Sequence, residues 1–173
     1  MKLIGLGGRA GAGKTLIARH LVERYNFTRT AFADPLKKML IDAGMCTWEE
    51  CYVEKTAQSR WLMQKVGELF RKNAHTRYWV RKWEDEVCRL QDTSIGLIVA
   101  DDIRHQNEAQ TIRIMGGTLI MVQRNNHVDA NAGLEHESES MVEAVECDYI
   151  FMADSGETDK LRWLMDEVMG ACQ

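Results

Sequence analysis

Short runs of apolar residues alternate along this chain with longer segments in which apolar residues recur every three or four positions. The short runs are typical of strands buried on both faces, and the longer periodic segments are typical of helices. The predicted strands cover residues 2–6, 30–33, 95–100, 118–123 and 149–152. Because strands and helices alternate, we expect an α/β fold in which a five-stranded parallel sheet carries helices on both faces.

The first predicted strand runs directly into a glycine-rich segment and then into a helix. The segment reads Gly8-Arg9-Ala10-Gly11-Ala12-Gly13-Lys14-Thr15 and fits G-x-x-x-x-G-K-[ST], the P-loop pattern. Its glycines let backbone N–H groups point inward, where they and the helix N-terminus hold phosphate oxygens. Lys14 then reaches the β- and γ-phosphates, and Thr15 offers its hydroxyl to Mg²⁺. The alternative is a glycine-rich turn with an incidental lysine, which the flanking strand and helix disfavour.

The ligand that this pattern predicts is a nucleoside triphosphate. The residues that we assign to it are the whole loop and the next residue of the helix: Gly8, Arg9, Ala10, Gly11, Ala12, Gly13, Lys14, Thr15 and Leu16.

The interval between the second and third predicted strands, residues 35–92, is much longer than one crossover helix needs. We expect three helices in it and a place for a second substrate, since ligands collect beyond the carboxyl ends of the strands. Its polar candidates for an anion are Arg60, Gln64, Arg71, Arg77 and Arg81. A guanidinium can grip two phosphate oxygens, although any one of these residues is more often simply solvated. Aromatic residues that either stack on a base or, more commonly, fill the core are Trp48, Trp61, Trp79 and Trp83.

Acidic residues stand at the ends of two predicted strands. Asp34 either binds Mg²⁺ through water or orients the acceptor, with capping of the following helix as the structural alternative, and one carboxylate can do both. Asp101 and Asp102 end the third strand in the Walker B arrangement, in which a carboxylate holds the metal or its water shell, and we favour Asp102. Arg104 either bridges the donor and acceptor phosphates or pairs with Glu108, four residues further along a helix.

Composition and charge narrow the class of protein. With 173 residues, 45% of them hydrophobic, the chain can bury one good core. Its five cysteines lack C-x-x-C spacing and indicate neither a disulfide framework nor a zinc site. Lys and Arg outnumber Asp and Glu by 17 to 10 in residues 1–90, whereas Asp and Glu outnumber them by 16 to 5 in residues 91–173. The basic half suits anionic substrates.

Other partners lack support. No dense basic stripe with interleaved aromatic residues indicates nucleic acid. No signal-peptide pattern and no apolar run long enough to cross a bilayer is found. We therefore expect a cytoplasmic enzyme, monomeric or homodimeric, that binds neither nucleic acid nor membranes.

Residues 124–140 are polar and weakly periodic, which predicts a lid over the nucleotide. The lid contains His136-Glu137-Ser138-Glu139, which does not complete the zinc motif H-E-x-x-H because residue 140 is serine. We therefore assign these four residues to the lid.

With these motifs in order, the chain resembles the deoxynucleoside monophosphate kinases of tailed bacteriophages, a branch of the P-loop nucleoside monophosphate kinases. The resemblance covers most of the chain. It rests on the P-loop, Phe32 to Lys37, the helix Arg60 to Arg71 with Gln64 and Gly67, Tyr78-Trp79-Val80, Asp102-Ile103-Arg104 with Glu108, Arg124, and His136 to Glu139.

This resemblance implies a three-layer P-loop kinase fold as one domain over residues 1–173, with a helical acceptor-binding insertion at 35–92 and a short lid at 124–140. It implies transfer of the ATP γ-phosphoryl group to a deoxynucleoside monophosphate with Mg²⁺. The catalytic residues would be Lys14, Asp34, Arg71 and Arg104. The acceptor-binding residues would be Asp34, Lys37, Arg60, Gln64, Arg71, Trp79, Arg104 and Glu108. The donor side would add Arg124 and the lid, and the metal site Thr15 and Asp102.

One departure concerns the donor base. Kinases of this branch tend to show an Asn-x-Gly turn near the last strand, whereas this chain has Asp154-Ser155-Gly156.

The residues by themselves leave two rival functions open. One is another small-molecule P-loop kinase of the dephospho-coenzyme A or shikimate type, whose hydroxyl acceptor would need a base such as Asp34. The other is a non-catalytic nucleotide-binding switch, although the guanine motif N-K-x-D of GTPase switches is not found.

Overall fold

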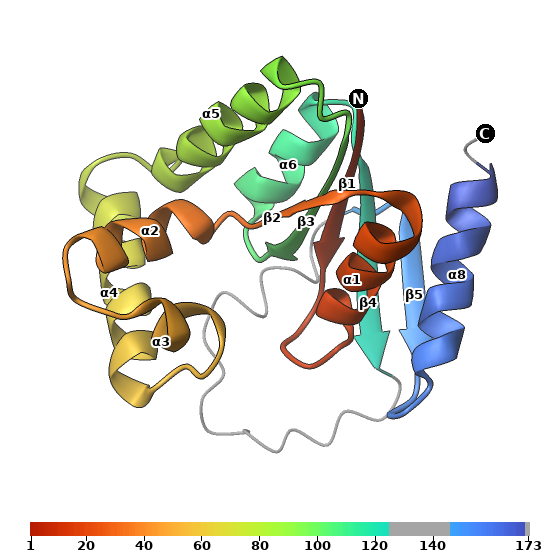
Figure 1. Ribbon diagram of the computed structural model, residues 1–173, viewed down its shortest axis with the longest axis horizontal. Coiled ribbons are helices and arrows are strands. Elements are labelled where there is room, and N and C mark those ends of the chain that lie inside the picture. Colours follow the sequence, from red (N-terminus) through yellow and green to blue (C-terminus); the bar gives the residue numbers. More distant parts are fainter. Residues whose placement is uncertain (125–145, 172–173) are drawn as a thin grey trace. The chain divides into compact units, whose positions relative to one another are not determined.

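The computed structural model describes residues 1–124 and 146–171 (Figure 1). Its contacts divide the chain into two compact units, one formed by Met1–Thr30 with Thr93–Gln173 and the other by Ala31–Asp92. The assignment of both units to one kinase domain with an insertion at 35–92 stays a prediction, as does the lid at 124–140.

The first unit is built on a five-stranded parallel sheet, as predicted (Figure 1). Its strands are β1 (Lys2–Gly7), β2 (Thr28–Thr30), β3 (Leu97–Ile103), β4 (Thr118–Arg124) and β5 (Tyr149–Ala153). They lie in the order β2-β3-β1-β4-β5, so the strand that leads into the glycine-rich loop is the central one. Its carboxyl end is therefore flanked by the ends of β3 and β4.

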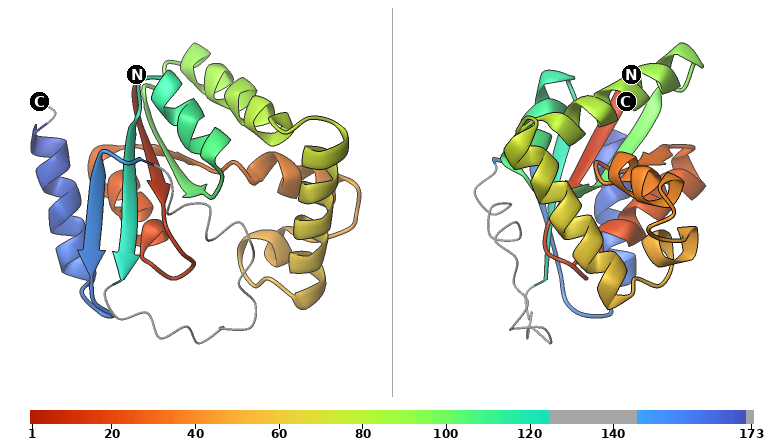
Figure 2. Two further views of the ribbon diagram at one scale, coloured as in Figure 1. Left: turned by 180° about the vertical axis from the view of Figure 1, so that it is seen from behind. Right: turned by 90° about the vertical axis from the view of Figure 1, so that its left-hand side faces the viewer.

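Helices cover both faces of this sheet, as Figure 2 shows. α1 (Lys14–Tyr25) and α8 (Thr158–Ala171) lie together on one face, and α6 (Gln106–Ile114) packs on β1 and β4 from the other. α6 ends before Gly116, whose φ of 72° is in the left-handed region that closes many helices. The three-layer α/β architecture expected from the alternation of elements is thus confirmed.

The second strand is shorter and earlier than predicted. Residues 30–33 were expected to form it because they are apolar, yet β2 covers Thr28–Thr30. Ala31 and Phe32 are buried, at 1% and 2% exposure, without belonging to the sheet. Phe32 belongs to the second unit, where it stacks on Trp83 with ring centroids 4.2 Å apart. The apolar run marks packing against a helix rather than strand pairing.

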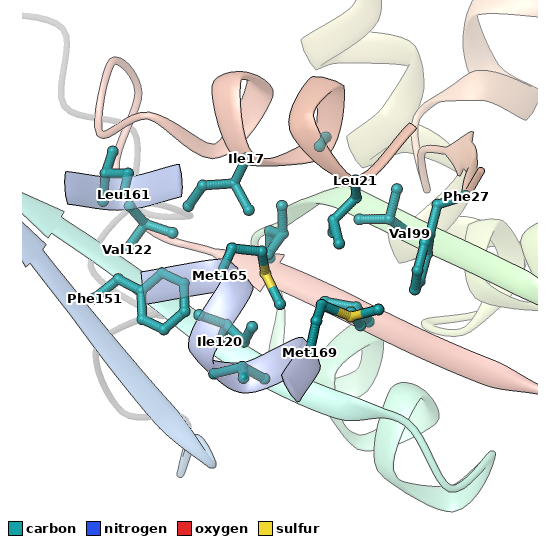
Figure 3. Packing of buried hydrophobic residues seen from close by; sticks show 14 of the residues in the cluster. Ile17, Leu21, Phe27, Val99, Ile120, Val122, Phe151, Leu161, Met165 and Met169 are labelled. Carbon is teal, nitrogen blue, oxygen red and sulfur yellow. The ribbon is translucent and has the colours of Figure 1, made fainter. Parts of the chain in front are cut away.

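The core of the first unit lies between the sheet and the pair α1 and α8 (Figure 3). Ile17 and Leu21 of α1 and Met165 of α8 are fully buried over Ile120 and Val122 of β4. Burying one such side chain contributes about 1.5–3 kcal/mol to folding, so this interlock fixes where α1 begins relative to β1.

A polar cluster joins α1 to α8. His20 Nε2 lies 2.6 Å from Asp166 Oδ1, and the Tyr25 hydroxyl donates to the same oxygen at 2.8 Å. Burial by itself raises the pKa of Asp166. The hydrogen bonds from His20 and Tyr25, with the charges of His20 and Arg24, outweigh it and hold that pKa below its ordinary value.

This shift predicts a pH effect on stability. Because the Asp166 pKa is depressed in the folded state, its contribution is present above the unfolded pKa of about 3.9 and is lost as the pH falls through the folded value. We expect Asp166→Asn to lower the free energy of unfolding at pH 7 by about 1 kcal/mol and to weaken this acid-side loss. Urea titrations from pH 7 to pH 3 measure both effects.

The matched control is Asp159→Asn on the same helix. Asp159 is 93% exposed and pairs only with Arg162 among the described residues, so its removal should change stability by a few tenths of a kcal/mol. Equal effects of the two substitutions would contradict a role for Asp166 in joining the helices.

The second unit is helical. It contains α2 (Asp34–Asp42), α3 (Trp48–Tyr52), α4 (Ala57–Asn73) and α5 (Tyr78–Asp92). Three helices were expected, and the additional one is α3, whose five residues are too few to show a helical period. Its signal is local: the Thr47 hydroxyl accepts from the Glu50 N–H, and the Glu50 carboxylate accepts from the Thr47 N–H.

α2, α4 and α5 pack around a small core of their own. Its fully or nearly buried members are Leu36, Leu40, Cys46, Cys51 and Trp79. Pro35 occupies the first turn of α2, as expected, because a first-turn residue needs no N–H for the helix.

Candidate active site

The loop between β1 and α1 has the backbone geometry that a phosphate cradle needs. Gly8, Gly11 and Gly13 all have positive φ, at 130°, 76° and 115°. A side chain at Gly8 would collide with the Val122 carbonyl oxygen of β4. Gly13 is the N-cap of α1 and makes no side-chain cap, so no capping side chain covers the first N–H groups of the helix. These groups carry the positive end of the helix dipole.

Lys14 lies inside this loop. Its ammonium donates to the carbonyl oxygens of Gly8 at 2.5 Å and of Arg9 at 2.7 Å. The cation is therefore held beside the backbone N–H groups of the loop, and Thr15 is exposed at the same helix terminus. One cation, several N–H donors and a hydroxyl together suit a polyphosphate.

The two aspartates at the end of β3 have different environments. Arg29 of β2 donates from Nε to Asp101 Oδ2 at 2.8 Å, and the Asp101 side chain is only 2% exposed. Asp102 is half-buried. The pairing of Asp101 with Arg29 favours Asp102 as the carboxylate that reaches solvent and a metal, and the assignment of Asp102 to the metal stays a prediction. Arg29 was missed by the sequence analysis because nothing local links it to a residue 72 positions away.

Arg104 and Glu108 do not form the ion pair that was offered as an alternative. Glu108 Oε2 accepts from the backbone N–H groups of Arg104 at 2.8 Å and His105 at 3.0 Å. Glu108 is 3% exposed, whereas the Arg104 side chain is exposed. The prediction that Glu108 contacts the acceptor is therefore replaced by a positioning role. Its carboxylate fixes the turn between β3 and α6 that presents Arg104.

The carboxyl end of β4 meets the turn after β5. Arg124 donates from Nη1 to the Ser155 hydroxyl at 3.3 Å. That turn is closed by the Asp154 N–H, which donates to Glu157 Oε2 at 2.8 Å. Leu161 lies one helical turn after Glu157 and packs against the P-loop. A Cβ placed at Gly13 would lie 2.6 Å from Leu161 Cδ1. Arg124 and the Asp154-Ser155-Gly156 turn therefore belong to the same edge of the sheet as the P-loop.

The predicted lid residues His136, Glu137, Ser138 and Glu139 lie outside the described residues. Within residues 1–124 and 146–171, no group of three or more His, Cys, Asp or Glu side chains is placed to hold a metal ion. Over the same residues, no helix is long and apolar enough to span a membrane.

In the second unit, Arg60, Gln64 and Arg71 share one face of α4, because spacings of four and seven residues return to the same side of a helix. Gly67 lies on that face, and a Cβ there would lie 3.2 Å from Leu36 Cδ2 and 3.5 Å from Arg71 Nη1. The small residue thus lets α2 approach α4 beside the Arg71 guanidinium.

Trp79 is not available to a ligand. It is 3% exposed, and its indole N–H donates to the Gly67 carbonyl oxygen at 3.0 Å. The structure therefore corrects its assignment to the acceptor: Trp79 is a core residue, like Trp83, and the other two tryptophans of this unit, Trp48 and Trp61, are more than half exposed.

Asp34 is the first residue of α2 rather than its cap, because Ala33 occupies the N-cap position. The capping alternative for Asp34 is thus wrong. Its Oδ1 lies 3.4 Å from the ammonium of Lys37, whose side chain is only 8% exposed. That ammonium also lies 4.2 Å from the centre of the Tyr52 ring. Lys37 is thus no surface charge, in contrast to Lys38, which is 75% exposed.

The fold is similar to that of solved kinase structures. The structure is similar to shikimate kinase from Bacteroides thetaiotaomicron, with a TM-score of 0.52 and 16% identity over 97% of this chain and 98% of that one. It is also similar to dephospho-CoA kinase from Campylobacter jejuni, with a TM-score of 0.54 and 12% identity over 98% and 96%. At these identities the likeness shows the fold alone, which is that of the P-loop kinases.

The sequence identifies the family. Residues 46–162 match the family model described as deoxynucleotide monophosphate kinase. A protein of Acanthamoeba polyphaga mimivirus that is assigned as a putative deoxynucleotide monophosphate kinase is 33% identical over an alignment of 147 residues, and the match covers 72% of this chain and 75% of that protein. The chain belongs to the deoxynucleotide monophosphate kinase family, whose members use ATP to phosphorylate deoxynucleoside monophosphates.

Proposed function

We propose that this kinase holds ATP on the P-loop of its first unit and the acceptor monophosphate on α2 and α4 of its second. The placement of ATP is supported by the Lys14 ammonium, which the Gly8 and Arg9 carbonyl oxygens hold beside the uncapped N-terminus of α1. The placement of the acceptor monophosphate is supported by the face of α4 that Arg60, Gln64 and Arg71 share.

The reaction needs charge and alignment more than a base. A phosphate monoester has a second pKa of about 6, so the acceptor is already largely ionised at neutral pH. One of its oxygens forms a bond to the γ-phosphorus of ATP while the bond from that phosphorus to the β-bridging oxygen breaks, giving ADP and the deoxynucleoside diphosphate. The cost lies in bringing one anion against another. Lys14, Arg71 and Arg104 are the cations that we assign to this task.

Asp34 completes the catalytic set as an orienting group. Its carboxylate lies beside the Lys37 ammonium. The pair can hold the substrate monophosphate because the ammonium donates hydrogen bonds and the carboxylate accepts them. Because the acceptor oxygen carries no proton to remove at neutral pH, Asp34 need not act as a general base.

Mg²⁺ fits the residues present. Thr15 is exposed at the start of α1 and Asp102 is half-buried at the end of β3. A hydroxyl and a carboxylate, with water and the nucleotide's own phosphates, are the hard oxygen ligands that Mg²⁺ takes in such sites. When bound, the ion would neutralise phosphate charge.

The order of the motifs and the composition also bear on where the enzyme works. We propose that it belongs to the bacteriophage branch of the family, that it works in the cytoplasm of a host cell, and that it is a monomer or a homodimer.

The test is a coupled assay for ADP with ATP, Mg²⁺ and each deoxynucleoside monophosphate in turn. Shikimate and dephospho-coenzyme A serve as hydroxyl acceptors. We expect turnover with at least one deoxynucleoside monophosphate and none with the two hydroxyl acceptors. Turnover confined to hydroxyl acceptors, or ATP hydrolysis that no acceptor stimulates, would overturn the proposal.

A further inference from the structure

α3 presents an aromatic pair at the surface of the second unit. The rings of Trp48 and Tyr52 stack with centroids 5.4 Å apart and planes 26° apart. Trp48 nevertheless stays 56% exposed. The reciprocal hydrogen bonds of Thr47 and Glu50 fix the start of α3 immediately before Trp48. The indole is therefore an exposed aromatic surface held by its neighbours.

A buried cation lies next to this pair. The Lys37 ammonium is 4.2 Å from the centre of the Tyr52 ring, and its carboxylate neighbour Asp34 is at 3.4 Å, a long ion pair. The Lys37 side chain is 8% exposed, so little water compensates the charge. A desolvated ammonium with a distant carboxylate favours a second anion. The Tyr52 ring links this cation to the exposed indole, because it contacts both. A flat exposed ring and a cation in one cluster match a nucleotide, which joins a flat base to a phosphate.

The other tryptophans of this unit lack this combination. Trp79 and Trp83 are buried. Trp61 is 57% exposed, but it lines a shallow surface hollow of α4 with Lys65, Leu69 and Lys72. On a helical period these residues fall outside the face that carries Arg60, Gln64 and Arg71. Trp48 is the exposed tryptophan that stacks on Tyr52, the ring that the Lys37 ammonium contacts.

We infer that Trp48, braced by Tyr52, is the platform on which the base of the acceptor nucleotide stacks. The inference rests on the proposed function and deepens it. Every base has a π-face, so stacking adds affinity without a hydrogen-bond code. The platform therefore admits purine and pyrimidine monophosphates and favours purines, which cover more of the indole.

Substitution tests this kinetically. Trp48→Ala should raise the KM for the deoxynucleoside monophosphate about tenfold and leave the KM for ATP unchanged. Trp48→Phe, which keeps an aromatic ring, should recover most of the loss. Trp61→Ala removes an equally exposed tryptophan from the same unit and should leave both KM values unchanged. Circular dichroism of each variant checks that it is folded.

Intrinsic fluorescence gives a readout that does not require turnover. Adding a deoxynucleoside monophosphate to the wild type should quench tryptophan emission. Trp48→Phe should lose that quenching, and Trp61→Phe should keep it.

The role of Trp48 is refuted, while the proposed function stands, if the wild type phosphorylates a monophosphate and two further results hold. These are that Trp48→Phe is quenched like the wild type, and that Trp48→Ala has the same KM for the monophosphate as Trp61→Ala. If the wild type neither turns over nor is quenched by any monophosphate, the proposed function itself fails, and the platform with it.

Discussion

Replacing Lys14 with methionine will lower kcat/KM for phosphoryl transfer by about 10³-fold, because it removes the ammonium that the carbonyl oxygens of the P-loop hold. Methionine keeps most of the side-chain length while it loses the charge. The Gly8 and Arg9 carbonyls lose their donor, yet the loop is partly exposed and water can replace it, so stability should fall by no more than about 1 kcal/mol. The coupled assay measures the rate, and thermal unfolding measures the stability.

Lys2→Met is the matched control, since it makes the same substitution at the amino end of the same strand, away from the loop. It should leave kcat/KM within about twofold of the wild-type value. Full activity of Lys14→Met, or an equal loss in both variants, would contradict the role given to Lys14.

Replacing Arg71 with alanine will lower kcat/KM for the acceptor by about 10²-fold and leave the Kd for ATP unchanged. Arg71 shares its helix face with Arg60 and Gln64, and Gly67 gives its guanidinium room beside α2. On the proposed function, its loss removes one bidentate donor from the acceptor phosphate. Calorimetric titration with ATP and initial rates at varied acceptor concentration separate the two effects.

Lys72→Ala controls for charge on the same helix. Lys72 is 71% exposed and pairs with Glu68 on the surface, so its removal should change neither quantity beyond about twofold. Loss of ATP affinity and of transfer to the same extent in Arg71→Ala would place Arg71 on the donor side or in the fold, and not with the acceptor.

Local sequence patterns predicted the sheet and the donor loop well. A buried strand of a parallel sheet reads as an apolar run, and the P-loop is defined by glycines whose positive φ values no other residue adopts easily. The face shared by Arg60, Gln64 and Arg71 follows from helical spacing alone. These features depend on residues close together in the chain.

Features that depend on distant partners were not predictable. β2 shifted because Phe32 packs on Trp83, about 50 residues away. The pairing of Arg29 with Asp101 crosses 72 positions, and the burial of Lys37 depends on the Tyr52 ring. Glu108 and Trp79 look like ligand contacts in the sequence, but the structure uses their polar atoms for backbone hydrogen bonds. Polar residues do not reveal from sequence whether they face a substrate or their own main chain.

The second unit is one unbroken stretch of chain, entered once after Thr30 and left once at Asp92. This stretch can therefore be exchanged between related kinases as one segment, with the order of the sheet strands and the P-loop kept. On the proposed function, the acceptor residues of α2 and α4 would travel with it. Chimaeras that exchange residues 31–92 between family members would then have the nucleotide preference of the family member that supplied those residues.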